Sequence, residues 1–239
     1  MRSRVLLVLA AALGAVVAAL LLLRLQSDAD RRERSYSLSA VLQAMDRYDA
    51  WHGALPAAVS RDSSGNPLSS WRFGLVRYLT AVKRHADWHV SWNAPENSEW
   101  ALRPGPHGLC LPGSRETRVY AITGPRTAFP EGDQHSLVDL PDDLVLMIEV
   151  CESKLHWMAP GDFDVREFDR KEAGFPLCAG DFCVGFADGT VLCLSARIPA
   201  AMLRDFLTID RAKNADREVL LGEYVLQRLP PPRSFRERE

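Results

Sequence analysis

The side chains of this chain that could do chemistry are its cysteines, its histidines and a few paired aspartates. A catalytic cysteine needs a histidine that helps to form the thiolate and a third group that orients this histidine. Cys151 and His156 are close in sequence, but Cys151 ends an apolar run, so we expect it to be buried and inert. Gly113-Ser114-Arg115 lacks the G-x-S-x-G spacing of the turn that exposes a catalytic serine. The sequence therefore predicts no nucleophilic enzyme.

The histidines and aspartates do not predict a metal site. His85 and His89 are four residues apart and would share one face of a helix, but the glutamate and third ligand of a metalloprotease pattern are missing. Asp142-Asp143 and the pair Asp162 and Asp164 could bind calcium outside a cell. No calcium-binding loop pattern accompanies them, so we expect solvated carboxylates and predict neither a metal nor a cofactor.

The cysteines predict at most two disulfides, because their number is odd. They are Cys110, Cys151, Cys178, Cys183 and Cys193. The four residues between Cys178 and Cys183 suit a local disulfide, and buried free thiols are the alternative. No C-x2-C pair is present, so zinc is not expected. The connectivity cannot be deduced from spacing alone.

Asp188-Gly189 lies between two runs of alternating apolar residues and predicts a β-hairpin over residues 182–195. A two-residue loop of type I′ needs positive φ at both positions, and Asp-Gly is a preferred pair for it. In that register Val184 faces Cys193. Cys183 and Cys193 would then lie on opposite faces, where they cannot form a disulfide.

The N-terminus contains an uncharged apolar run at residues 5–23. As a helix it would span roughly 28 Å, close to the hydrocarbon thickness of a bilayer. The run exceeds the apolar region of a cleaved signal peptide, and no clear A-x-A site follows it. We predict an uncleaved single-pass membrane anchor. Arginines lie on both sides of the run, so the positive-inside count does not choose the orientation.

The helix is predicted to continue beyond the membrane as an amphipathic segment at residues 35–50. Apolar residues recur there at helical spacing and form one stripe, which consists of Leu38, Val41, Leu42, Met45 and Tyr48. Gly53 and Pro56 are predicted to end the helix. We expect residues 24–229 to form an α+β domain in which this stripe packs on an antiparallel sheet. The tail at 230–239, which begins with three prolines, is predicted to be disordered.

The rest of the domain is predicted to alternate short strands and short helices. Strands are expected at 88–92, 118–122, 144–150 and 219–229, and helices at 69–79 and 199–207. Residues 157–172 are charged and contain Pro160 and Gly161, so we expect mostly loop. The net charge is only -2, with no basic block outside the tail, so no nucleic-acid partner is predicted.

Several separate blocks of the chain have distinctive residues. The most specific runs from Gly65-Asn66-Pro67 through Trp71-Arg72 to residue 79, and the others lie at 38–58, 92–97, 117–129, 157–162 and 186–208. Near the C-terminus, Asp188-Gly189 follows Cys178 after nine residues. Together these blocks resemble the planctomycete-type pseudopilin-like proteins of unknown function, whose signature is a histidine, nine residues and Asp-Gly. Cys178 stands where that family has its histidine.

The resemblance implies a membrane helix, an amphipathic continuation and a pilin-like domain outside the cytoplasm. On this basis we expect the helix to cross the inner membrane once, with residues 1–4 as a cytoplasmic stub and residues 24–229 as an extracytoplasmic domain. It marks a structural signature made of Trp71, Arg72, Cys178, Asp188 and Gly189. The chain departs from pilins at its N-terminus, which has no Gly-Phe-Thr-Leu-Ile-Glu type processing site and no glutamate in the apolar run. Peptidase cleavage and ordinary filament assembly are therefore not implied.

We expect a non-enzymatic pseudopilin-like envelope protein that is a component or accessory of a secretion or surface assembly. Its expected partners are the lipid bilayer and either envelope proteins or further copies of itself. The alternative is a membrane-tethered module that binds glycans or envelope proteins through exposed tryptophans. Core packing is the expected place for most of the six tryptophans, Trp71 in particular. A third possible function is that of an envelope hydrolase, but no set of catalytic residues in the sequence supports it.

Overall fold

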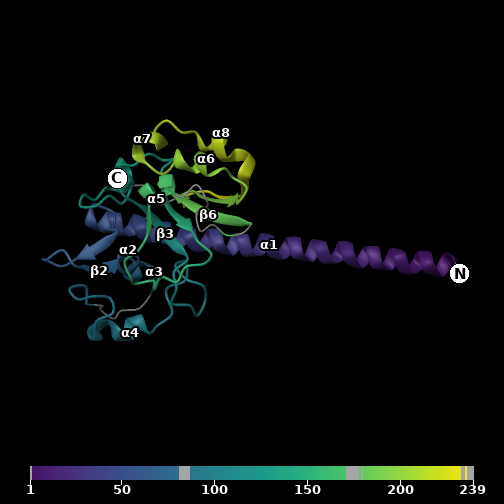
Figure 1. Ribbon diagram of the computed structural model, residues 1–239, viewed down its shortest axis with the longest axis horizontal. Coiled ribbons are helices and arrows are strands. Elements are labelled where there is room, and N and C mark those ends of the chain that lie inside the picture. The colour runs from purple at the N-terminus through teal and green to yellow at the C-terminus, as the bar shows by residue number, and fades with distance from the viewer. Residues whose placement is uncertain (1, 81–86, 171–177, 179, 233–234, 236–239) are drawn as a thin grey trace. The chain divides into compact units, whose positions relative to one another are not determined.

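The computed structural model describes residues 2–80, 87–170, 178, 180–232 and 235. The chain divides into two compact units, Met1–Arg34 and Ser35–Glu239. Helix α1 (Arg2–His52) begins in the first unit and ends in the second (Figure 1). In the first unit, leucines and valines between Leu13 and Leu25 are exposed along the helix. From Ala12 onward α1 is long and apolar enough to cross a membrane, as the apolar run predicted.

The second unit is built on a six-stranded sheet with the order β5-β3-β4-β6-β7-β8. Its strands are β3 (Val119–Thr123), β4 (Val145–Glu149), β5 (Phe163–Asp164), β6 (Asp181–Phe186), β7 (Val191–Ser195) and β8 (Val225–Leu229). Neighbouring strands are antiparallel, except that β5 pairs in parallel with β3. The fold is α+β as predicted, and the expected antiparallel sheet is corrected to a mixed one at this edge.

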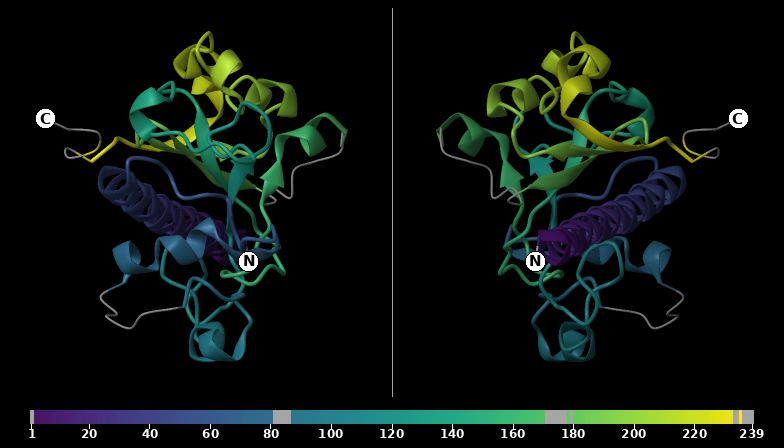
Figure 2. Two further views of the ribbon diagram at one scale, coloured as in Figure 1. Left: turned by 90° about the vertical axis from the view of Figure 1, so that its left-hand side faces the viewer. Right: turned by 90° about the vertical axis from the view of Figure 1, so that its right-hand side faces the viewer.

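The two faces of the sheet are covered by different helices (Figure 2). The C-terminal part of α1 lies on one face, and α6 (Ala200–Arg204), α7 (Ile209–Ala212) and α8 (Arg217–Leu221) lie over the other. Successive side chains of a strand point to opposite faces. In β6, Cys183 therefore belongs to the core on the α1 side, whereas Phe182 and Val184 belong to the core on the other side.

The predicted apolar stripe of α1 is confirmed. Leu38, Val41, Leu42 and Met45 are all at most 2% exposed. Gly185 in β6 allows the helix to approach this closely, because a Cβ there would lie 3.1 Å from Cδ1 of Leu42. The helix ends at His52, next to Gly53 with its φ of +76°, as the sequence predicted.

On the side of α1 away from the sheet, Figure 2 shows a layer of short elements. They are β1 (Val59–Arg61), β2 (Pro67–Ser70), α2 (Trp71–Gly74), α3 (Val76–Leu79), η1 (Pro95–Asn97) and α4 (Ser98–Ala101). The helix predicted at 69–79 is therefore present as two short ones. The chain also contains η2 (Leu137–Asp139), α5 (Val165–Arg170) and η3 (Gly222–Tyr224).

Three predictions of secondary structure are wrong. In each case a side-chain hydrogen bond or the pairing with a neighbouring strand determines the backbone conformation, and the local sequence pattern does not. Residues 88–92 form turns rather than a strand, and the Asp87 carboxylate accepts the His89 N–H at 2.9 Å. The first half of 219–229 is helical, because Asp216 caps α8 by accepting the N–H groups of its first turn. Residues 163–170 are not loop, since β5 pairs with β3 and leads into α5.

Candidate functional site

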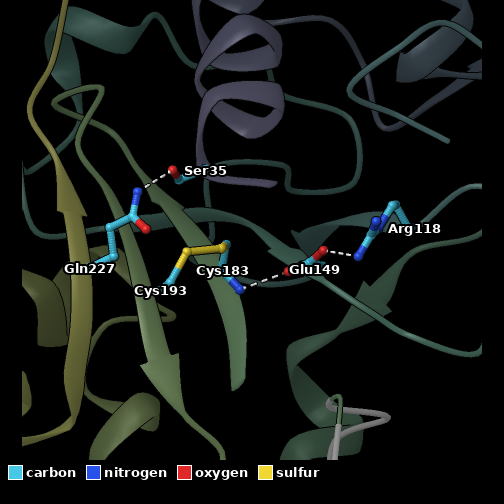
Figure 3. Close-up of a disulfide and its surroundings, with 6 residues drawn as sticks. All are labelled: Ser35, Arg118, Glu149, Cys183, Cys193 and Gln227. Carbon is cyan, nitrogen blue, oxygen red and sulfur yellow. Dashed lines mark hydrogen bonds and ion pairs between the residues drawn. A yellow bond between two sulfur atoms is a disulfide. The ribbon is translucent and has the colours of Figure 1, made fainter. Parts of the chain in front are cut away.

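The cysteines of the hairpin form a disulfide between Cys183 and Cys193, at the centre of the sheet face that α1 covers (Figure 3). The two residues are direct partners in the β6–β7 register, with Cα atoms 4.0 Å apart. Our expectation that they lie on opposite faces is therefore wrong. So is the expected local pairing of Cys178 with Cys183.

The register differs from the predicted one because the hairpin loop is longer than expected. The Phe186 N–H bonds to the Thr190 carbonyl, and the Gly189 N–H bonds to the Phe186 carbonyl, which leaves three residues in the loop instead of two. Gly189 has a φ of +87°, but the only non-glycine residue with positive φ in the described chain is Arg126, so Asp188 is not left-handed and the turn is not type I′. One extra loop residue shifts the register by one position, which reverses the face of every side chain in one strand relative to the other.

The pairing also explains the buried carboxylate beside the disulfide. Because Phe186 and Thr190 form a hydrogen-bonded pair, the alternation along the ladder makes Cys183 and Cys193 a non-hydrogen-bonded pair. The Cys183 N–H therefore points toward β4, where Oε2 of Glu149 accepts it at 3.0 Å. The other oxygen of Glu149 pairs with Arg118 (Figure 3). On the neighbouring strand β8, Gln227 donates a hydrogen bond to the Ser35 hydroxyl of α1 at 2.8 Å.

The second disulfide joins Cys151, which follows β4, to Cys178. Cys178 is the position where the resembled family has its signature histidine, and here it is buried in the core on the α6–α8 side. Cys151 is exposed, contrary to our expectation. Cys110 is the one free cysteine, and burial raises the pKa of its thiol to about 12. Since only a thiolate is a good nucleophile, Cys110 is inert at neutral pH.

Asp188 and Gly189 fix the shape and the surroundings of the hairpin loop. The Asp188 carboxylate accepts the Thr190 N–H and hydroxyl, both at 2.8 Å, and pairs with Arg217 at the start of α8. Burial alone would raise the pKa of Asp188, but the hydrogen bonds from Arg217 and Thr190 outweigh it and lower this pKa. Phe235, in the tail that we predicted to be disordered, is 8% exposed and lies over Gly189.

Replacing Gly189 with Ala is expected to destabilise the domain for two reasons. A left-handed backbone costs an L-residue about 1–2 kcal/mol, and a Cβ at this position would lie 2.7 Å from the Phe235 ring. The matched control is Gly113→Ala, because Gly113 has a φ of +78° but no atom within 4 Å of the added Cβ. In urea unfolding of the full chain in detergent, Gly189→Ala should lose about 1 kcal/mol more than Gly113→Ala. Equal losses would mean that Phe235 does not restrain the loop.

Trp71 and Arg72 begin α2 and contact Asp162, which directly precedes β5. The Asp162 Oδ1 atom accepts hydrogen bonds from Nε1 of Trp71 at 3.0 Å, Nη2 of Arg72 at 2.5 Å and the Ala121 N–H at 2.8 Å. Trp71 is 1% exposed, as predicted. Arg72 also donates to the Val119 carbonyl of β3 and to the Gly161 carbonyl, so it joins α2 to two other segments of the chain. Asp162, expected to be solvated, has a side chain only 3% exposed.

Most of the other aromatic side chains are structural as well. Trp100 and Trp157 are buried, Trp92 is half-buried and stacks on His156 at 4.6 Å, and the ring of His156 bonds to the Ala101 carbonyl. Burial lowers the pKa of His156, which favours a neutral imidazole. Trp51 is 76% and Trp88 39% exposed. His85 of the predicted histidine pair lies outside the described residues.

The structure thus places the five signature residues in three groups of contacts: Trp71 and Arg72 with Asp162, Cys178 with Cys151, and Asp188 and Gly189 with Arg217 and Phe235. Each group joins segments that are distant in sequence. Within the described residues, no three His, Cys, Asp or Glu side chains come together as a metal site would require.

Fold and contacts together define a class: a disulfide-bonded α+β domain that follows one candidate membrane-spanning helix. The chain matches no protein-family model, no curated protein and no solved structure.

Proposed function

We propose that this chain is a membrane-anchored, pseudopilin-like envelope protein of the inner membrane, with its domain outside the cytoplasm and no enzymatic activity of its own. In this proposal it is a component or accessory of a secretion or surface assembly. The observation that supports it most is the continuity of α1, a single helix whose N-terminal part is apolar and exposed and whose C-terminal part packs on the sheet.

The resemblance described above adds support, because its blocks cover the domain part of this helix, from residue 38, and much of the domain that follows. Its specific block at 65–79 corresponds to the buried anchor of Trp71 and Arg72. The absence of enzymatic activity rests on the sequence, which has no nucleophile or metal-ligand pattern.

The two disulfides support the proposed side of the membrane. Disulfides form and persist in oxidising compartments and are rare in the cytoplasm. Cys151–Cys178 and Cys183–Cys193 both cross-link elements of the domain, and Cys183–Cys193 is fully buried. A domain folded in this oxidised form belongs on the outer side of the inner membrane, with the short N-terminal stub in the cytoplasm.

The orientation can be tested through the redox state of the cysteines. Cells that express the full chain are denatured in the presence of a thiol-alkylating reagent, and the peptides are mapped by mass spectrometry. We expect only Cys110 to be alkylated before reduction. A chain that lacks residues 1–34 and stays in the cytoplasm serves as the control, and all five of its cysteines should be alkylated. Full alkylation of the membrane-bound chain would overturn the proposed orientation.

Assembly can be tested on the exposed face of the domain part of α1. Tyr36, Ala40, Arg47 and Ala50 are exposed at helical spacing, opposite the buried stripe. A photo-crosslinking amino acid at Ala40 is expected to capture a second copy or an envelope protein at native expression levels. The same residue at Val219, which is 78% exposed on α8, is the control. Monomer alone at both positions would contradict a role in assembly.

The alternative of a tryptophan-based binding module has less support. Four of the six tryptophans are buried or half-buried, so a binding platform would depend on Trp51 and Trp88.

A further inference from the structure

The strand β1 has one edge that no other strand covers. Within the described residues, β1 and β2 form a two-stranded sheet, and β1 pairs with β2 alone. The outer edge of β2 is closed by backbone bonds, since the Leu68 C=O accepts the Trp92 N–H at 2.8 Å. The Ser70 N–H likewise donates to the Met158 C=O at 3.0 Å. The outer edge of β1 is therefore the open side of this small sheet.

Val59 is the residue of β1 whose backbone groups face the open edge. Its register partner is Ser70, whose N–H is directed away from β1, to Met158. The next ladder bond runs from the Trp71 N–H to the Ala58 C=O at 3.1 Å. The alternation of an antiparallel ladder therefore makes Val59 and Ser70 a non-hydrogen-bonded pair. The N–H and C=O of Val59 point away from β2, and within the described residues neither of them takes part in a hydrogen bond.

A cavity of about 510 Å³ lies along this edge. Its lining includes Ala57, Val59 and Arg61, the alternate residues of the edge, and also Ala58. Neighbouring side chains of a strand point to opposite faces. A cavity that touches Ala58 as well as Val59 therefore lies beside the edge of β1 and not over one face of it. Val59 is half-buried and Ala57 is exposed, so the edge is accessible from solvent.

The rest of the lining includes apolar surface, with Pro56, Ala128 and Phe129 among its residues. The volume of the cavity is within the range of ligand sites in proteins. The site thus combines a free N–H and a free C=O on one residue with apolar groups nearby. An extended peptide matches this combination, because its backbone supplies a donor and an acceptor at strand spacing and its side chains fill the space beside them.

We propose that the cavity beside β1 binds an extended segment of another protein, which pairs with β1 as a third strand. The N–H and C=O of Val59 bond to the backbone of that segment, and an apolar side chain of the segment lies against Phe129. This inference does not depend on the proposed role in an assembly.

The first test is calorimetric titration of the full chain in detergent with the peptide acetyl-Ser-Val-Thr-Val-Ser-amide. We expect a Kd on the order of 0.1 mM. The control is the same peptide with a methyl group on every backbone nitrogen, which keeps the side chains and removes the donors. Because strand addition depends on backbone hydrogen bonds, this control should bind at least about tenfold more weakly. Equal binding of the two peptides, or no binding of the unmodified one, would overturn the proposal.

Hydrogen exchange resolved at single amides locates the site without any change to the protein. In the free chain the Val59 N–H should exchange at least about tenfold faster than the Ser60 N–H, which faces β2 in the ladder. Saturating peptide should slow exchange at Val59 at least about tenfold and leave Ser60 unchanged. Slow exchange at Val59 in the free chain would show that this edge is already bonded and would contradict the proposal. So would protection of β8, the edge strand of the large sheet, in place of Val59.

Two variants of Val59 separate the backbone from the side chain. Val59→Pro removes the N–H that points away from β2, and proline is tolerated at such an edge position, so the domain should keep its melting temperature. The Kd of the peptide should rise at least about tenfold. The matched control is Val59→Thr, which keeps the N–H and a β-branched side chain and should change the Kd less than about twofold. Equal affinities of the two variants would overturn the proposal, and should Val59→Pro not fold, the methylated peptide and the exchange measurement decide in its place.

Discussion

Replacing Leu42 with Asp is expected to separate α1 from the sheet and to bring the domain close to global unfolding. Leu42 is fully buried and lies against Gly185 of β6. Loss of a buried leucine costs about 2–5 kcal/mol, and an unpaired carboxylate in this core adds to that cost. Since domains are stable by only about 5–15 kcal/mol, this one change removes a large part of the total.

The measurement is limited proteolysis and urea unfolding of the full chain in detergent, followed by tryptophan fluorescence. Ala40→Asp is the matched control, because it places the same residue on the exposed face of the same helix. Its cost should stay within about 1 kcal/mol, which reflects helix propensity alone. If Leu42→Asp resists protease as well as Ala40→Asp does, the stripe is not part of the core.

The helix and most strands could be predicted because their patterns are local. The spacing of Leu38, Val41, Leu42 and Met45 is a property of one segment, and so is the apolar alternation on both sides of Asp188-Gly189. The hairpin register could not be predicted in the same way. It depends on whether the loop has two or three residues, and in the structure the Asp188 carboxylate is also held by the distant Arg217. A single loop residue decided whether Cys183 could pair with Cys193.

The contacts of the signature residues were equally hard to predict, because their partners are far apart in sequence. Arg72 and Asp162 are separated by 90 positions, and the Cys151–Cys178 pair by 27. The burial of Trp71 could be predicted, because a tryptophan that belongs to an apolar segment is expected to pack in the core. No local feature pointed to Asp162 as the partner of Arg72, and the neighbouring Asp164 fits the pattern of a solvated carboxylate just as well.

Replacing Arg72 with Met is expected to lower the free energy of unfolding by about 3–5 kcal/mol, because it removes the guanidinium and leaves the buried Asp162 carboxylate without its counter-charge. Arg72 is fully buried and donates to the Val119 carbonyl at 2.9 Å and the Gly161 carbonyl at 3.0 Å as well as to Asp162. Its guanidinium also lies 5.0 Å from the centre of the Trp71 ring. Burial raises the pKa of Asp162 and lowers the pKa of Arg72, and the opposite charge of each partner counteracts both shifts.

A double-mutant cycle distinguishes this pair from a general loss of packing. Asp162→Asn alone should also be strongly destabilising, because it leaves a buried guanidinium unpaired. The double variant Arg72→Met with Asp162→Asn should lose much less than the sum of the single variants, since neither charge is then left alone. Arg166→Met is the matched control: its ion pair with Asp164 is exposed, so the cost should stay near 1 kcal/mol or below. Additive losses would mean that Arg72 stabilises the domain by packing and by its carbonyl contacts, and that its pairing with Asp162 contributes nothing.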